Sequence, residues 1–300
     1  MHEPRAIFIT GGGSGIGRAV ALRFAAEDWL VGIADIDEAG MVETAAQLPQ
    51  GHTSLHLLDV RDRDKWDRSL AEFAKFSGGR LDVMFNNAGI GLGGPFQHAA
   101  KHEIDALIDI NLRGMMYGAH AAHPYLAATA GSCLLNMASA SALYGSAGLA
   151  VYSATKYGIR GLSEALDVEW GPSGIKVRCL FPSFVDTPML AGTPGSSEDS
   201  KRDRVLKSGA KLTPVEEVAQ HAWQAVHGSR LHVLVGKAAR SLAFKARWRP
   251  ISCGRSFAAR AASSSGCRRS RAARPACEPR RTAWRRWSSN SCWSRCARKR

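Results

Sequence analysis

The sequence predicts an α/β fold, in which a doubly wound parallel β-sheet lies between two layers of helices in a single domain. Seven short apolar runs rich in β-branched residues recur along residues 1–248, and longer stretches with helical spacing separate them. Strands that are apolar along their whole length are buried on both faces, and intervening helices favour parallel pairing. A chain of 248 residues is also long enough for one sizeable core.

Strands and helices are expected to alternate along the domain. Helical spacing is clearest from Arg18 to Ala26 and from Lys101 to Leu126. The segment AGTPGSSEDSKRD (191–203) is rich in Gly, Ser and charge and suits a lid, and we expect residues 187–212 to cover a substrate. The expected strands are AIFIT (6–10), LVGIAD (30–35), SLHLLDV (54–60), LDVMFNN (81–87), SCLLNMA (132–138), IKVRCLF (175–181) and LHVLV (231–235).

The net charge of +14 comes entirely from the last 52 residues. Residues 249–300 hold 14 Arg, one Lys and one Glu, whereas residues 1–248 hold 25 basic and 25 acidic residues. The last segment also lacks Leu, Val, Met, Asp and Tyr, so it cannot bury enough apolar area to offset the entropy of ordering it. We therefore divide the chain into a folded domain, 1–248, and a tail, 249–300, that is disordered or not genuine.

Three interpretations of this tail stay open. Its arginines could neutralise phosphates and three tryptophans could stack on bases, as in a nucleic-acid-binding arm. It could also be a neutral disordered tail. The favoured interpretation is a change of reading frame near residues 249–252, because Arg, Ala, Ser, Gly, Pro, Cys and Trp all have G/C-rich codons. Nucleic acid is accordingly not an expected partner.

The sequence also bears on location. The apolar run at 6–10 follows the start almost at once, without the charged region and core of a signal peptide. No apolar stretch approaches the roughly 20 residues that span a bilayer. Cys133 and Cys179 each lie in an apolar run, which favours buried reduced thiols over a disulfide. We expect a cytoplasmic protein with no membrane partner.

A glycine-rich turn, TGGGSGIGRAV (10–20), follows the first expected strand and opens a helix. Gly11, Gly15 and Gly17 fit a TGxxxGxG pattern and not the i, i+2, i+5 spacing of the common dinucleotide fingerprint. Glycines permit a tight turn and bring backbone N–H groups close to a pyrophosphate at a helix N-terminus. The alternative is a purely structural loop.

Asp35 ends the second expected strand, about twenty residues beyond the glycine turn. An acid at this place binds a ribose 2′-hydroxyl and repels a 2′-phosphate. Neither Ile36 nor Ser14 supplies a compensating positive charge. The sequence therefore favours NAD over NADP, although Asp35 could also be an ordinary helix N-cap.

Tyr152 and Lys156, in YSATK, lie four residues apart and so share one face of a helix. A tyrosine hydroxyl titrates near pH 10 and is a poor base at neutral pH unless a nearby ammonium favours the phenolate. Such a tyrosine could remove an alcohol proton as a general base. By itself, the pair is also compatible with an ordinary amphipathic helix.

Taken in order, the glycine turn, NNAG (86–89), Ser139, Tyr152 and Lys156 resemble the short-chain dehydrogenase/reductase family over about residues 5–236. The resemblance implies a Rossmann fold and an NAD(P)-dependent oxidoreductase that interconverts a secondary alcohol and a ketone. It implies that Tyr152 is the general acid/base, that Lys156 lowers its pKa and binds the nicotinamide ribose, and that Ser139 binds the substrate oxygen. Asn111 would hold a water in the proton relay.

The implied cofactor contacts run along the whole domain. Asp59 and Val60 match residues beside the adenine, Asn87 to Gly89 line the cofactor's edge, and Thr187 matches the contact to the nicotinamide carboxamide. The chain departs from the family where Pro182-Ser183 replaces Pro-Gly and where Ala138-Ser139 replaces a pair of serines. The full set is Thr10, Gly11, Ser14, Gly15, Ile16, Gly17, Asp35, Asp59, Val60, Asn87, Ala88, Gly89, Tyr152, Lys156, Pro182 and Thr187.

Other features carry weaker expectations. His98 and His102, and likewise His120 and His123, lack a third ligand, so we expect solvent-facing residues and no metal site. The small, apolar run at 139–152 favours a neutral, partly hydrophobic substrate. The resemblance implies a homotetramer or homodimer. The alternative functions are an NADPH-dependent carbonyl reductase of the same fold and a non-catalytic nucleotide sensor, and the complete Ser-Tyr-Lys set argues against the sensor.

Overall fold

The computed structural model describes residues 4–191, 200–207 and 209–248. Residues 249–300 and most of the 191–203 segment lie outside the described residues, so the predictions of a tail and of a lid there stay predictions. By its contacts the chain divides into two units, residues 1–266 and 267–300.

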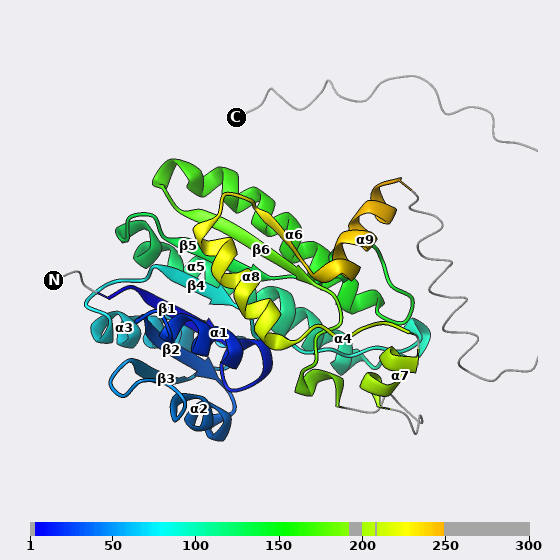
Figure 1. Cartoon of the computed structure of the whole chain (residues 1–300), viewed down its shortest axis with the longest axis horizontal. Coiled ribbons are helices and arrows are strands. Elements are labelled where there is room, and N and C mark those ends of the chain that lie inside the picture. The colour runs from blue at the N-terminus through cyan, green and yellow to red at the C-terminus, as the bar shows by residue number, and fades with distance from the viewer. Residues whose placement is uncertain (1–3, 192–199, 208, 249–300) are drawn as a thin grey trace, which may run out of the picture. The chain divides into compact units, whose positions relative to one another are not determined.

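The described residues form a seven-stranded, all-parallel sheet in the order β3-β2-β1-β4-β5-β6-β7 (Figure 1). Each expected strand is found within three residues of its predicted bounds, so the predicted fold class is confirmed. The strands are β1 (Ala6–Thr10), β2 (Leu30–Asp35), β3 (Thr53–Leu57), β4 (Val83–Asn86), β5 (Cys133–Met137), β6 (Lys176–Pro182) and β7 (His232–Val235).

Helices cover both faces of the sheet. On one face α1 packs against α8, and on the other α3 packs against α5, while α4 packs against α6. The α-helices of the described residues are α1 (Gly15–Ala25), α2 (Glu38–Ala45), α3 (Arg63–Phe76), α4 (Lys101–Ile108), α5 (Gly114–Ala128), α6 (Ala150–Trp170), α7 (Lys201–Lys207), α8 (Val215–His227) and α9 (Gly236–Trp248).

Strand β1 shows how the sheet separates two cores. Successive side chains of a strand point to opposite faces. Ile7 and Ile9 accordingly join a hydrophobic cluster with Phe24 of α1, whereas Phe8 joins a second cluster with Trp66 of α3. All five side chains are fully buried. The apolar character of the whole strand is therefore explained by burial on both faces.

The stretch of helical spacing from Lys101 to Leu126 is helical, but it is divided into two helices. A π-helical turn, Asp109–Arg113, separates α4 from α5. The turn holds Asn111, which is fully buried. A π-turn inserts one extra residue into a helix and re-aims the side chains around it. Hydrophobic periodicity cannot reveal such an insertion, because the apolar spacing continues on either side.

The order of the strands fixes where a ligand can bind. The chain runs outward from β1 through β2 to β3, and then returns to β4 on the other side of β1. In open parallel sheets, ligands bind at the carboxyl ends of strands at such a reversal of order. The loops after β1 and β4 meet there, so this edge is where the candidate site residues should gather.

Candidate active site

The glycine turn is packed so closely that side chains are excluded from it. A Cβ on Gly17 would lie 2.0 Å from the carbonyl oxygen of Gly11. Gly11 itself has φ of +67°, and a Cβ there would lie 3.0 Å from the Cα of Ala88. These two glycines are therefore required by the close approach of helix α1 to the turn and of the turn to the loop after β4.

The N-terminus of α1 is open. Its N-cap residue, Ser14, makes no side-chain cap hydrogen bond, and the first turn of α1 contains no acid. By contrast, Asp37 and Asp62 cap α2 and α3 by accepting backbone N–H bonds. Uncapped N–H groups and the positive end of a helix together form a site for an anion. This helix end could therefore hold a phosphate group.

Thr10 and Asn87 fasten the two loops together. The Thr10 hydroxyl accepts hydrogen bonds from the backbone N–H groups of Asn87 (3.0 Å) and Ala88 (3.1 Å). The Asn87 side-chain amide donates to the carbonyl of Thr10 at 2.9 Å. These bonds hold the loop after β4, which continues into Gly89, against the end of β1.

Asp35 lies beside the glycine turn, and part of its carboxylate is already used. Oδ1 accepts the backbone N–H groups of Ile36 (2.7 Å) and Asp37 (3.1 Å), and Oδ2 accepts that of Gly13 (2.9 Å). A carboxylate offers about four acceptor sites, so one on Oδ2 remains for a hydroxyl donor. Because the helix α2 cap is Asp37, Asp35 is not the ordinary N-cap that the sequence left open.

Arg18 is a residue that sequence reasoning missed. Its guanidinium lies next to the turn, where Nη2 donates to the Gly13 carbonyl at 2.6 Å and to Glu43 at 3.0 Å. Its Nε donates to Thr44 at 2.9 Å. The guanidinium of Arg18 is therefore bonded to the glycine turn and to two side chains of α2. The position of Arg18 in GIGR, one turn into α1, could have indicated this role.

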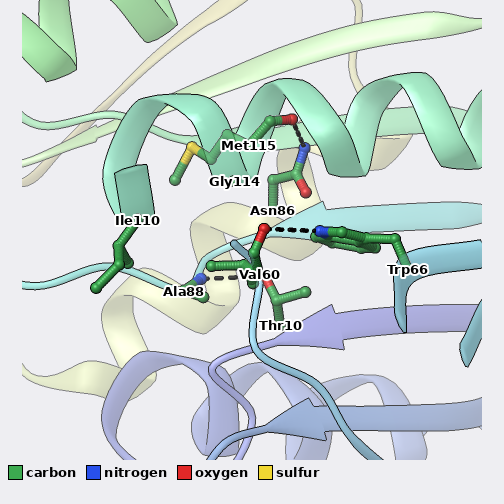
Figure 2. A pocket seen from close by; sticks show the side chains of 8 residues that line it. All are labelled: Thr10, Val60, Trp66, Asn86, Ala88, Ile110, Gly114 and Met115. Carbon is green, nitrogen blue, oxygen red and sulfur yellow. Dashed lines mark hydrogen bonds between the residues drawn. The ribbon is translucent and has the colours of Figure 1, made fainter. Parts of the chain in front are cut away.

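Asp59 and Val60 follow β3 at the same edge of the sheet. Arg61 binds the Asp59 carboxylate through Nε (3.0 Å to each oxygen) and Nη2 (2.6 Å), and this holds the pKa of Asp59 below its usual value. The Val60 carbonyl accepts the Trp66 indole N–H at 3.0 Å. These contacts fix the loop next to the crevice in Figure 2.

Figure 2 shows the floor of the crevice between the loops. Val60, Ala88 and Ile110 lie around Thr10, and Asn86 donates to the Met115 carbonyl at 3.1 Å. The crevice has no room for a water molecule between these side chains. The lining residues are thus closely packed against one another beneath the loops that follow β1 and β4.

Ser139, Tyr152 and Lys156 come together at the end of β5. Ser139 begins a 3₁₀ turn and its hydroxyl accepts the Ser141 N–H at 3.2 Å. The Ser139 side chain lies near the Tyr152 phenol, and its polar interaction favours a lower pKa of the phenol. The Lys156 ammonium lies 5.7 Å from the centroid of the Tyr152 ring, one helical turn along α6. The three side chains predicted from separate parts of the sequence form one cluster.

Burial dominates the electrostatics of this cluster. Lys156 is almost fully buried and donates to the Met137 carbonyl at 2.9 Å. Burial lowers the pKa of Lys156 to about 8. Burial raises the pKa of Tyr152, and the interaction with Ser139 partly offsets this rise. The pKa of Tyr152 is thus raised overall in this structure, because desolvation outweighs the effect of Ser139, and the lowering of this pKa by Lys156 stays a prediction.

Asn111 holds the loop after β4 from the π-turn. Its Oδ1 accepts the Ile90 N–H at 2.8 Å, and its Nδ2 donates to the Ile90 carbonyl at 2.9 Å. A Cβ on Gly89 would lie 3.0 Å from the same Oδ1. Both polar atoms of the side-chain amide thus bond Ile90 and hold the loop, while one N–H and one acceptor position remain for the water predicted there.

Thr187 and Pro182 lie on the loop after β6. Thr187 approaches the glycine turn, since a Cβ on Gly15 would lie 3.3 Å from its methyl group. Pro182 ends β6, and the next residue, Ser183, has a buried hydroxyl without a hydrogen-bond partner among the described residues. The Pro182-Ser183 departure from the family thus places a polar atom where a glycine would have none.

The remaining expectations concern residues away from the site. His98, His102 and His120 are exposed, but His123 is half-buried with its ring 4.9 Å from that of Trp170, so solvent exposure is wrong for it. Within the described ranges, no group of three or more His, Cys, Asp or Glu is placed to hold a metal. Cys133 and Cys179 are buried free thiols. No helix among the described residues is long and apolar enough to span a membrane.

Comparisons with known proteins agree with this geometry. The family model for short chain dehydrogenases matches residues 5–196. The meso-2,3-butanediol dehydrogenase of Serratia marcescens is 32% identical over 223 residues, which cover 74% of this chain and 88% of that enzyme.

Solved structures point the same way. A crystal structure of levodione reductase matches with a TM-score of 0.71 and 27% identity over 79% of this chain and 98% of that one. A 3-ketoacyl-(acyl-carrier-protein) reductase of Brucella melitensis, complexed with NADH, matches with a TM-score of 0.68 and 27% identity over 78% and 97%. The chain belongs to the short-chain dehydrogenase/reductase family and is an oxidoreductase of the kind that acts on CH–OH groups with NAD(P).

Proposed function

We propose that the protein is an NAD-dependent dehydrogenase/reductase that interconverts a secondary alcohol and a ketone. The observation that carries this proposal is the cluster of Ser139, Tyr152 and Lys156 at the carboxyl edge of the sheet, with the Lys156 ammonium 5.7 Å from the Tyr152 ring centroid. The open N-terminus of α1 lies at the same edge of the sheet. Together they offer a place for a dinucleotide and a proton donor beside its reacting end.

The residues present fit a dinucleotide. The tight turn that Gly11 and Gly17 permit leads into the uncapped N-terminus of α1, whose backbone N–H groups suit a pyrophosphate. Further contacts are proposed for Ser14, Gly15 and Ile16 at this turn, and for Asp59, Val60 and Asn87 to Gly89 along the adenine and central part. Pro182 and Thr187 would contact the nicotinamide.

The proposal of NAD over NADP rests on Asp35. Its remaining acceptor site suits a ribose hydroxyl, whereas its charge would repel a 2′-phosphate. Arg18 is the nearest candidate for a compensating cation, but Glu43 and the Gly13 carbonyl bind the same Nη2. The NADH complex of the Brucella melitensis reductase is in line with this proposal.

The mechanism follows from what the side chains can hold and move. The bound nicotinamide supplies the hydride acceptor or donor. The hydroxyl of Ser139 donates a hydrogen bond to the substrate oxygen and orients the reacting carbon. The hydroxyl of Tyr152 gives its proton to that oxygen during ketone reduction and takes it back during alcohol oxidation. Lys156 would bind the ribose hydroxyls, and the support of Asn111 keeps the neighbouring loop in place.

Because the pKa of Tyr152 is raised, the rates of oxidation and reduction should depend on pH in different ways. A phenol with a raised pKa stays protonated at neutral pH, and it is then ready to act as the acid in ketone reduction. Alcohol oxidation needs the phenolate and should accelerate as pH rises toward that pKa. The rate of oxidation is therefore expected to rise with pH, while reduction is retained at neutral pH.

The class of substrate is proposed only broadly. The run 139–152 supplies small and apolar groups, which suit a neutral, partly hydrophobic compound. The name meso-2,3-butanediol dehydrogenase, borne by one relative, is consistent with a small secondary alcohol. Residues 187–212 would cover this compound.

A cytoplasmic homo-oligomer is part of the proposal. Exposed apolar side chains lie along α4, α5 and α6, including Ile108, Met116 and Val168, which is 77% exposed. Apolar side chains left in water on neighbouring helices are typical of an interface. A homodimer or homotetramer built on these helices would bury them, and light scattering of the full chain tests this.

The test of the function is a panel of secondary alcohols and ketones, assayed with NAD(H) and NADP(H) on the full chain. Turnover with NAD(H) and a clear preference over NADP(H) are expected. The runner-up function is an NADPH-dependent carbonyl reductase of the same fold. The alternative of a different class is a non-catalytic nucleotide sensor, which would bind NAD without turnover of any compound. A preference for NADP would overturn the assignment of Asp35.

A further inference from the structure

Helix α9 differs in charge from the rest of the described protein. It carries Lys237, Arg240, Lys245 and Arg247 and no acid. No Asp or Glu occurs anywhere from residue 218 to residue 277. Residues 1–235, in contrast, hold 21 basic and 25 acidic residues. The cations of α9 are thus segregated at one end of a domain that is otherwise slightly acidic.

Only the first turns of α9 are held by the domain. Gly236 and Ala239 are buried, and the helix contacts β6, β7 and the 3₁₀ turn at 140–142. Beyond Ala239 no side chain of the helix is buried. Figure 1 shows α9 directly after β7. The remaining turns therefore offer a face that the described residues do not cover.

Two aromatic rings lie in the middle of that face. Phe244 is 68% exposed and Trp248 is 67% exposed, and their ring centroids are 6.5 Å apart. At about 100° per residue, both lie on the side of the helix opposite Ala239. The same spacing puts Arg240 and Arg247 along one flank of the pair and Lys245 along the other, all of them exposed.

This pattern has a physical meaning. Aromatic rings exposed in water are an apolar surface that a partner would cover. A helix with aromatic residues between flanking cations suits the boundary of an anionic membrane, where rings enter the acyl boundary and cations meet phosphates. We propose that α9 is an interfacial helix that binds an anionic lipid surface through Phe244 and Trp248. This inference is independent of the proposed catalytic function.

Other occupants fit the face less well. Symmetric pairing of α9 with α9 of a second copy would bring like charges together, because a two-fold interface uses the same patch twice. Nucleic acid would favour rings that are free to stack separately on bases, whereas these two rings contact each other as one patch, tilted by 47°. The expectation of no membrane partner considered only a spanning segment, and an interfacial helix needs none.

The test is sedimentation of the full chain with vesicles of phosphatidylcholine alone and of phosphatidylcholine mixed with phosphatidylglycerol. The full chain should bind the anionic vesicles and should not bind the neutral ones. The double variant Phe244→Ser/Trp248→Ser should bind the anionic vesicles at least about tenfold more weakly. The matched control is Val42→Ser/Leu57→Ser, which replaces two exposed apolar residues (54% and 56%) outside α9 and should bind like the wild type.

Every variant carries the same basic tail, so a difference in vesicle binding between variants does not come from the charge of the tail. If the double variant binds the anionic vesicles as well as wild type does, charge alone drives binding and the proposal is overturned. It is also overturned if neither protein binds vesicles, or if the double variant loses binding to a DNA duplex or loses its oligomeric state while vesicle binding is unchanged. Far-UV circular dichroism and turnover, both expected to be unchanged in the double variant, separate a lost contact from a lost fold.

Discussion

The carboxylate of Asp35 bonds the backbone of the glycine turn, and we propose that it also selects NAD over NADP. Three of its acceptor positions hold backbone N–H groups of residues 13, 36 and 37. The charge is thus fixed beside the place proposed for the ribose. The nearby guanidinium of Arg18, bound to Glu43, adds little free positive charge there. The selectivity of the site is therefore expected to depend on this single side chain.

Asp35→Ala should raise the KM for NAD about tenfold, because a hydrogen bond to the ribose, worth roughly 1.4 kcal/mol, is lost. The ratio of kcat/KM for NAD over NADP should fall by more than the loss of NAD alone, since the repulsion of a 2′-phosphate is also gone. Asp35→Asn is the matched control, because it keeps the shape and acceptor oxygen but removes the charge. An unchanged ratio in both variants would show that Asp35 does not select the cofactor.

Lys156 gives the stability of the protein a dependence on pH. Its pKa is about 8 in the folded chain and 10.5 in a model compound, because burial disfavours the charged form. Below pH 8 the ammonium is charged in both states, and folding carries the full cost of burying it. As pH rises from about 8 to 10.5, the folded state loses its proton first and this cost disappears.

Lys156→Met should therefore be more stable than wild type at pH 7, by about 2 kcal/mol after allowance for the lost bond to the Met137 carbonyl. The difference in the free energy of unfolding should shrink between pH 8 and pH 10. Urea unfolding of both proteins at the two pH values measures it. A difference that stays constant with pH would contradict the buried, charge-sensitive lysine described above.

At the scale of an element, the glycine turn depends on close contact between backbones. A Cβ on Gly17 meets the Gly11 carbonyl oxygen at 2.0 Å, and neither backbone can move without opening the turn. Gly17→Ala should abolish measurable NAD binding and lower the melting temperature. Gly161→Ala in α6 is the control, because its Cβ would meet nothing within 4 Å.

The control variant Gly161→Ala should bind NAD like the wild type and gain about 0.5–1 kcal/mol of stability from the helix. Isothermal titration with NAD and thermal unfolding compare the two variants. Normal NAD binding by Gly17→Ala would show that the turn tolerates a side chain and is not shaped for a pyrophosphate.

The same elements show what the sequence could reveal. The strands were predictable because burial on both faces leaves an unbroken apolar run, as in AIFIT at residues 6–10. The π-turn around Asn111 was not, since an extra residue in a helix leaves the apolar pattern intact. The role of Arg18 depends on where α2 places Glu43 and Thr44, which is a tertiary contact.

The candidate site also has features that the sequence could predict and features that it could not. Ser139, Tyr152 and Lys156 could be found from motif spacing, and the structure brings them together. The directions in which the pKa values of Tyr152 and Lys156 shift could not be predicted from motif spacing, because desolvation depends on how deeply α6 is buried. The unpartnered hydroxyl of Ser183 likewise became visible only with its surroundings.

At the scale of the whole molecule, the charge balance separates domain from tail. Residues 1–248 are neutral overall, and residues 249–300 carry the whole net charge. Removal of residues 249–300 should leave kcat and KM within about twofold, since no site residue lies there. Retention on a heparin column should fall sharply, because counterion release scales with the number of basic residues.

Steady-state kinetics and heparin chromatography of the truncated and full chains measure both effects. A large loss of turnover on truncation would mean that the tail belongs to the enzyme and would contradict the division at residue 248. Sequencing of the gene's end is an independent check on the reading frame.

The central claim is that Tyr152 moves the proton in an NAD-dependent reaction, and one comparison tests it most directly. Turnover of a secondary alcohol by the full chain and by Tyr152→Phe is measured with NAD, alongside NADH binding followed by fluorescence. Loss of the hydroxyl should lower kcat by about 10²–10⁴-fold, the usual contribution of general acid–base catalysis, while NADH binding stays within a few-fold of wild type. Retained turnover in Tyr152→Phe, or NADH binding without turnover in the wild type, would contradict the claim.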